Sequence, residues 1–133
     1  MKHVVIDTNV LVSSVISLEG NPAKIMDMIA DKQLLIHYSP DILDEYRRVL
    51  SYKKLCIALQ TQAGIIHEIE KLGISIEPTK SATPLPDESD RIFYDTAKAS
   101  GAILVTGNTK HYPAESFIMT PADFLKESEL NTS

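Results

Sequence analysis

Apolar and polar positions along the chain follow two alternating periods. Short runs of apolar, largely β-branched residues predict strands at residues 3–6, 34–37, 74–76, 103–105 and 117–119. Between them, apolar residues at helical spacing predict helices at residues 9–17, 22–31, 40–50, 55–72, 88–100 and from residue 121 onward. Apolar strands that alternate with helices are typical of a parallel sheet covered by helices. The pattern therefore predicts an α/β fold.

Residues at the ends of these segments mark several boundaries. Ser39 and Thr120 each stand before a proline, which is how a capping hydroxyl precedes a proline in the first helical turn. Gly73 and Gly101 stand where a left-handed residue would close a helix. Residues 77–87 hold three prolines and no periodic pattern, so we expect a surface loop there.

Length and composition indicate one globular domain spanning residues 1–133. Of the 133 residues, 44% are hydrophobic and 23% are charged, which allows a sizeable core. Residues 126–133 are polar and are expected to fray. The single cysteine, Cys56, excludes an internal disulfide and is expected in the core. No apolar run has membrane-spanning length and no room is left for a signal peptide, so we expect a cytoplasmic protein.

Charge is distributed unevenly along the chain. The net charge of −5 argues against general nucleic-acid binding, because non-specific affinity comes mostly from neutralised phosphates. Four of the 13 basic residues nevertheless fall close together, namely Arg47, Arg48, Lys53 and Lys54. The cluster is interpreted either as a solvated helix face or as a contact for a phosphate backbone.

Two carboxylates stand at positions that an α/β fold can bring together. Asp7 follows an apolar strand and should lie at its carboxyl end, where open α/β sheets hold ligands. It can alternatively cap the next helix. Glu45 lies at the rim of the apolar stripe of its helix, roughly 100° from the centre, whereas Asp44 faces water and Tyr46 is expected in the core. An ordinary boundary glutamate is the alternative for Glu45.

A third carboxylate opens the helix predicted at residues 88–100. Asp90 lies near one edge of the inward face in the first turn, whereas Asp95 lies farther out on the opposite flank, and Asp87 is placed as the cap. After the next strand, Asn108 offers a neutral oxygen at the same sheet edge, with a simple turn as its alternative. Converging carboxylates repel one another unless a cation lies between them, so this arrangement predicts a metal site.

The order and spacing of these segments resemble the PIN-domain family, whose members are mostly metal-dependent ribonucleases, many of them toxins of toxin-antitoxin pairs. The resemblance covers nearly the whole chain and rests on VVIDTNVLVSS, SPDILDEYRRVL, DESDRIFYDTAKASGAILVTGNTKHYP and MTPADFL. The family's first three acids match Asp7, Glu45 and Asp90. A fourth position, often aspartate, falls on Asn108, which removes one negative charge and would weaken binding of a second ion.

The resemblance implies a three-layer α/β/α fold with a central, mostly parallel sheet of about four to five strands. It also implies an endoribonuclease that hydrolyses RNA phosphodiester bonds with Mg²⁺ or Mn²⁺, an antitoxin protein as partner, and a homodimer. We expect metal binding by Asp7, Glu45 and Asp90, with Asn108 in the catalytic site. The expected supporting residues are Thr8, Asn9, Asp87 and Thr106. The expected RNA contacts are Arg47, Arg48, Lys53, Lys54 and Lys110.

Other chemistries fit less well. The chain contains no dinucleotide-binding or P-loop glycine motif, no G-x-S-x-G elbow and no histidine pair at helical spacing. One open alternative is an aspartate-dependent phosphoryl-transfer or receiver-type domain that uses Asp7. Asn9 stands where a dehalogenase-like enzyme would have a second aspartate, and the first strand lacks the paired acids of a receiver. A second alternative is a catalytically silent PIN-like module that binds RNA or protein.

Overall fold

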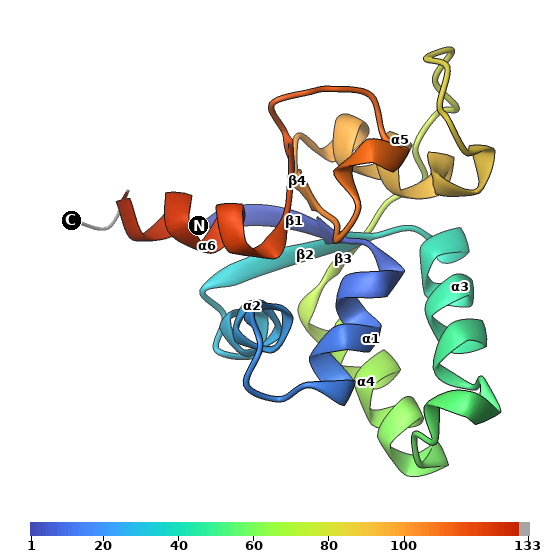
Figure 1. Cartoon of the computed structure of the whole chain (residues 1–133). Helices are drawn as coiled ribbons and strands as arrows, with labels where there is room; N and C mark the ends of the chain where they lie inside the picture. Colours follow the sequence, from blue (N-terminus) through green and yellow to red (C-terminus); the bar gives the residue numbers. More distant parts are fainter. Residues whose placement is uncertain (131–133) are drawn as a thin grey trace.

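The computed structural model describes residues 1–130 and contains a five-stranded sheet with strand order β3-β2-β1-β4-β5 (Figure 1). The strands are β1 (Lys2–Ile6), β2 (Leu34–Tyr38), β3 (Ile74–Ser75), β4 (Ile103–Val105) and β5 (Ile118–Met119). All four pairings are parallel, and Val4 of the central strand β1 pairs with Ile36 on one side and Ile103 on the other. The predicted parallel sheet is confirmed.

Helices cover both faces of the sheet. Within residues 1–130 they are α1 (Thr8–Ile16), α2 (Asn21–Ala30), α3 (Pro40–Leu50), α4 (Leu59–Leu72), α5 (Arg91–Ser100) and α6 (Pro121–Leu130). Short 3-10 turns occur at η1 (Lys53–Leu55), η2 (Glu88–Asp90) and η3 (Thr109–His111). Figure 1 shows α5 on one face and α1, α2 and α4 on the other, so the three-layer arrangement is also confirmed.

The core forms where apolar strand residues meet the apolar stripes of the helices. Val4, Val5 and Ile6 are completely buried, as expected for a central strand with both faces covered. Tyr46 is completely buried too, as predicted, and its hydroxyl donates a hydrogen bond to the carbonyl of Ile6. This contact ties α3 to the end of β1, immediately before Asp7.

Three of the four predicted boundary signals are confirmed. The hydroxyl oxygens of Ser39 and Thr120 accept hydrogen bonds from backbone N–H groups in the first turns of α3 and α6, at 3.1 and 3.2 Å. Gly101 closes α5 in the left-handed conformation, with φ of 70°. Gly73 does not, because its φ is −99°.

Close packing explains glycine at position 73 instead. A Cβ atom there would lie 2.8 Å from the Ile36 side chain, the Ile36 carbonyl and the Ile69 carbonyl. The end of α4 therefore approaches β2 too closely for any side chain.

The helix predicted at residues 55–72 begins only at Leu59. Cys56 has φ of 54°, and a left-handed residue cannot continue a helix. The chain instead turns there from α3 into α4, which pack against each other (Figure 1). Cys56 is exposed in this turn, so its expected place in the core was wrong.

The carboxyl-terminal helix extends farther than expected. Residues 126–130, predicted to fray, belong to α6, whose Phe124 is completely buried. Residues 131–133 of the predicted tail lie outside the described residues. None of the helices in residues 1–130 is long and apolar enough to cross a membrane.

Candidate functional site

The predicted acids lie around the carboxyl edge of the sheet. Asp7 directly follows β1 and Thr106 directly follows the adjacent strand β4, so both leave the sheet at the same edge. Glu45 lies in the second turn of α3, and Asp90 ends η2. In Figure 1 the start of α3 and the chain entering α5 lie on the same side of the molecule as the end of β1.

Asp7 is buried and held by two hydroxyl groups. Its Oδ2 accepts hydrogen bonds from Thr106 Oγ1 at 2.7 Å and from the Tyr112 hydroxyl at 2.9 Å. Asp7 occupies the residue position before α1, but its side chain makes no capping hydrogen bond. The capping alternative is therefore wrong, and the carboxylate points to the loops that follow β4.

Glu45 lies at the boundary between core and solvent, as predicted. Its side chain is 20% exposed, whereas that of Asp44 is 74% exposed. Thr8 Oγ1 donates a hydrogen bond to Glu45 Oε2. Thr8, which directly follows Asp7, thus holds the Glu45 carboxylate next to the end of β1.

Asp90 is the most electrostatically perturbed of these acids. Its Oδ2 is buried without a hydrogen-bond partner, and His111 Nδ1 lies 3.5 Å from that oxygen. Burial, followed by the charges of Asp7 and Asp87, raises the pKa of Asp90 to about 6. Glu45 adds a smaller contribution in the same direction. A positive charge at this position would be strongly favoured.

The Tyr112 hydroxyl contacts Asp7 and lies near enough to Asp90 and Glu45 to be affected by their charges. Burial raises the pKa of the Tyr112 hydroxyl, and the charges of Asp7, Asp90 and Glu45 raise it further. Within residues 1–130, however, no three acid, histidine or cysteine side chains are close enough to enclose a metal ion on their own. An ion at this edge would need water or substrate oxygens to complete its coordination.

Three of the remaining site candidates have identifiable local roles. Asn9 Oδ1 accepts a hydrogen bond from the Gly107 amide at 3.1 Å, which fixes the loop after β4 and not an acid. The backbone N–H of Asn108 donates to Thr106 Oγ1 at 3.1 Å, and Asn108 lines an open pocket of about 190 Å³ with Asn9. No hydrogen bond joins its side chain to a described acid. Asp87 caps η2, as predicted, by accepting from the amide of the second residue after it.

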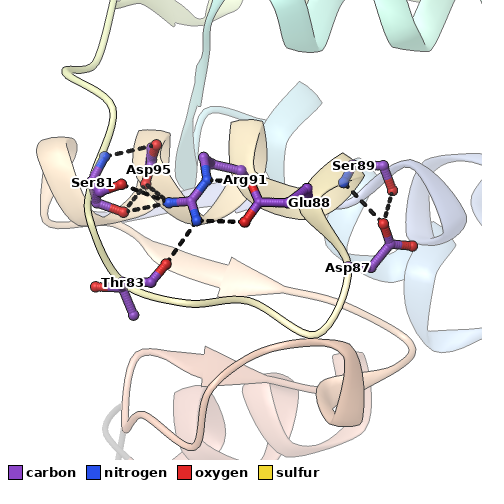
Figure 2. Close-up of polar contacts among 7 residues, drawn as sticks. All are labelled: Ser81, Thr83, Asp87, Glu88, Ser89, Arg91 and Asp95. Atoms are coloured by element: carbon purple, nitrogen blue, oxygen red, sulfur yellow. Dashed lines mark hydrogen bonds and ion pairs between the residues drawn. The ribbon is translucent and has the colours of Figure 1, made fainter.

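The partly buried guanidinium of Arg91 fixes the loop at residues 77–87 to the start of α5 (Figure 2). Arg91, 11% exposed, donates to both carboxylate oxygens of Glu88 at 2.7 and 2.8 Å and to the carbonyls of Ser81 and Thr83 at 2.8 and 2.7 Å. Asp95 accepts from the Ser81 hydroxyl at 2.6 Å and from its amide at 3.1 Å. Asp95 is therefore buried, and its predicted outer position was wrong because the loop covers it.

The basic residues differ in whether an acidic side chain already pairs with them. Arg48 lies nearest the acids, with Nη2 3.5 Å from Glu45 Oε1. Arg47 instead pairs with Asp44 at 3.0 Å and with Glu70 at 3.7 Å. Three exposed lysines on η1 and η3 form no ion pair with a described residue: Lys53, Lys54 and Lys110.

Sequence reasoning missed Tyr112 as part of the site. It lies in a polar loop beyond η3, where an aromatic residue has no periodic partner that would mark it as core. The feature that marks Tyr112 as part of the site is its burial, and the folded structure shows this burial whereas the sequence does not.

Comparison with known proteins supports one family. Residues 3–110 match the model of the PIN domain. An uncharacterized protein of Methanocaldococcus jannaschii is 30% identical, over 95% of this chain and 91% of that protein. A crystal structure of VapBC2 from Rickettsia felis, bound to a DNA fragment from its promoter, has a similar fold, with a TM-score of 0.58 at 18% identity, over 89% of this chain and 96% of that one. The chain belongs to the PIN-domain family.

Proposed function

We propose that this protein is a divalent-metal-dependent endoribonuclease that hydrolyses RNA phosphodiester bonds. The observation that carries the proposal is the way short contacts link the three acids at the carboxyl edge of the sheet. Tyr112 donates to Asp7, its neighbour His111 lies 3.5 Å from Asp90, and Thr8, the residue after Asp7, donates to Glu45. Membership of the PIN-domain family supports the same chemistry. The phosphoryl-acceptor alternative is disfavoured, because Asn9 stands where a dehalogenase-like enzyme would have its second aspartate and the first strand lacks the paired acids of a receiver.

The available side chains suit Mg²⁺ or Mn²⁺. All three acids offer carboxylate oxygens, which are the ligands that Mg²⁺ prefers, and Mg²⁺ normally keeps several waters. The buried Oδ2 of Asp90 has no hydrogen-bond partner within the described residues and only the imidazole of His111 at 3.5 Å, so a divalent ion would supply a stronger positive partner. When bound, the ion acidifies a coordinated water and stabilises charge on the phosphate oxygens.

The residues of the chain hold and orient the groups around that ion. Thr106 fixes the Asp7 carboxylate, and Thr8 fixes the Glu45 carboxylate. Arg48, beside Glu45, can receive a phosphate of the RNA backbone. The exposed lysines attract the rest of the strand: Lys53, Lys54 and Lys110. In this proposal Asn108 adds a neutral oxygen, so a second ion is held more weakly than in a four-acid site.

We further infer that the protein is the toxin of a toxin-antitoxin pair, acts in the cytoplasm as a homodimer, and is inhibited by an antitoxin protein. Similarity of fold to a VapBC2 complex supports this assignment. An antitoxin would place a basic side chain against the acidic sheet edge, in competition with metal or RNA. Co-purification with the product of an adjacent reading frame would support the pairing. A lone gene whose expression leaves growth unchanged would contradict it.

Cleavage of labelled single-stranded and structured RNA, with Mn²⁺ and with EDTA, tests the enzymatic proposal. We expect Asp7→Asn and Glu45→Gln to lower the rate by about 100-fold or more. Asp44→Asn, one residue away but facing solvent, should retain wild-type activity. Cleavage that persists in EDTA would contradict metal dependence. RNA binding without cleavage, and without Mn²⁺ binding by calorimetry, would favour the silent binding module instead.

A further inference from the structure

The hydroxyl of Tyr112 meets the carboxylate of Asp7 in the interior of the protein. The two oxygens lie 2.9 Å apart, and the two residues are 4% and 6% exposed. Tyr112 follows the PIN-matched segment, residues 3–110, and no role for it follows from that match. The contact therefore needs an explanation from the structure itself.

Two hydroxyls act on the same oxygen of Asp7. Tyr112 and Thr106 both donate to Oδ2, whereas Oδ1 has no hydrogen-bond partner among residues 1–130. Oδ1 is also absent from the group of fully buried atoms that lack a partner, so it keeps part of the small exposed area of Asp7. The carboxylate is thus held in one orientation, with one oxygen anchored and the other open.

Tyr112 is well suited to act only as a donor. A phenol is protonated near neutral pH, and the Asp7 carboxylate is the acceptor that its hydroxyl meets. A neutral phenol on a rigid ring fixes a carboxylate without adding a charge that would compete with a cation.

Tyr112 also anchors the loop that reaches Asp90. Its backbone N–H donates to the carbonyl of Thr109 at 3.1 Å, which closes η3. The preceding residue, His111, lies 3.5 Å from Asp90 Oδ2. The segment from η3 to Tyr112 therefore contacts both Asp7 and Asp90.

We propose that Tyr112 is a positioning residue that orients Asp7 for metal binding. Its hydroxyl, together with that of Thr106, holds Oδ2 and leaves Oδ1 as the oxygen that would bind an ion. The inference rests on the proposed metal-dependent function and deepens it, because it assigns the orientation of the first carboxylate to a residue beyond the matched PIN segment.

Calorimetric titration of Mn²⁺ into Tyr112→Phe tests this role. The substitution keeps the buried ring and removes only the donor. We expect the dissociation constant to rise by about 10-fold or more, the usual effect of losing a hydrogen bond to a metal ligand. Tyr94→Phe is the matched control, because the Tyr94 hydroxyl is also buried but has no hydrogen-bond partner in the described structure. Its Mn²⁺ affinity should stay within about twofold of wild type.

The outcomes separate the inference from the proposed function. If Asp7→Asn weakens Mn²⁺ binding and Tyr112→Phe does not, the positioning role is overturned and the metal site stands. If Asp7→Asn also binds Mn²⁺ like wild type, the proposed site fails and the inference fails with it. Thermal unfolding must show every variant folded at the titration temperature.

A measurement on the wild type avoids any dependence on variant folding. Ring resonances of Tyr112 should shift during Mg²⁺ titration with the dissociation constant found by calorimetry, while those of Tyr94 stay in place. Resonances of Tyr112 that do not move at saturating Mg²⁺ would overturn the inference.

Discussion

His111 Nδ1 lies 3.5 Å from the buried Oδ2 of Asp90, an oxygen that has no hydrogen-bond partner within residues 1–130. The environment of Asp90 thus combines the half-exposed imidazole of His111 with the like charges of Asp7 and Asp87. Burial and these like charges keep its folded-state pKa at about 6, above its ordinary value of 3.8.

This raised pKa predicts a pH-dependent stability of the metal-free protein. Between about pH 4 and 6 the folded state binds more protons than the unfolded state, so the free energy of unfolding falls as the pH rises. We expect a loss of about 1 to 2 kcal/mol over this range, after allowance for solvent screening. Urea unfolding in EDTA should show this slope in wild type. Subtracting the Asp90→Asn curve isolates the contribution, and parallel curves for the two proteins would contradict it.

Removal of two lysines should reduce the salt dependence of RNA binding. Lys53→Gln with Lys54→Gln, in an Asp7→Asn background that prevents cleavage, removes two phosphate contacts. The slope of log K against log salt for a single-stranded RNA should then fall by about 1.4. Lys24→Gln, which alters an exposed lysine on α2, is the control and should leave the slope unchanged. Fluorescence anisotropy at several salt concentrations measures both, and equal slopes for all variants would exclude η1 from the RNA path.

Arg91→Ala should destabilise the fold strongly. It leaves the Glu88 carboxylate, two loop carbonyls and the buried Asp95 without their cationic partner, so the urea midpoint should fall well below that of wild type. Arg91→Lys should recover only part of this, because an ammonium cannot make the forked contacts. Urea denaturation measures the stability of each variant. Arg47→Ala is the control, because it removes only exposed ion pairs and should lower the free energy of unfolding by less than about 0.5 kcal/mol. If the two alanine variants lost similar stability, the contacts between Arg91 and the loop at residues 77–87 would not stabilise the fold as proposed.

Two glycines of the same region should respond oppositely to alanine. Gly73→Ala places a Cβ atom 2.8 Å from Ile36 and should destabilise the protein by about 1 to 3 kcal/mol. Gly64, inside α4, has open space where a Cβ atom would lie, with no neighbouring atom within 4 Å, so Gly64→Ala should stabilise the protein by up to about 1 kcal/mol. Thermal or urea unfolding decides the sign of each change. A tolerated alanine at position 73 would show that the approach of α4 to β2 can relax.

Local patterns were sufficient for most of the fold. The burial of β1 and the caps at Ser39 and Thr120 follow from residues that are neighbours in sequence, so their periodicity and turn chemistry could be read directly. The left-handed turn at Cys56 could not, because nothing in its own sequence opposes a helix. It lies in the connection between α3 and α4, which pack against each other, so the reason for the turn involves residues outside its own neighbourhood in the sequence.

For the candidate site, the sequence by itself determined which acids stand at the ends of strands and at the starts of helices. Only the tertiary structure decided their surroundings: Tyr112 donates to Asp7 across 105 positions, and Ser81 covers Asp95 from a loop without periodicity. Such contacts depend on which strand ends and loops the parallel sheet brings to one edge. Periodicity reports which face of an element is apolar, but the partner of a buried polar group is set by segments far away in the chain.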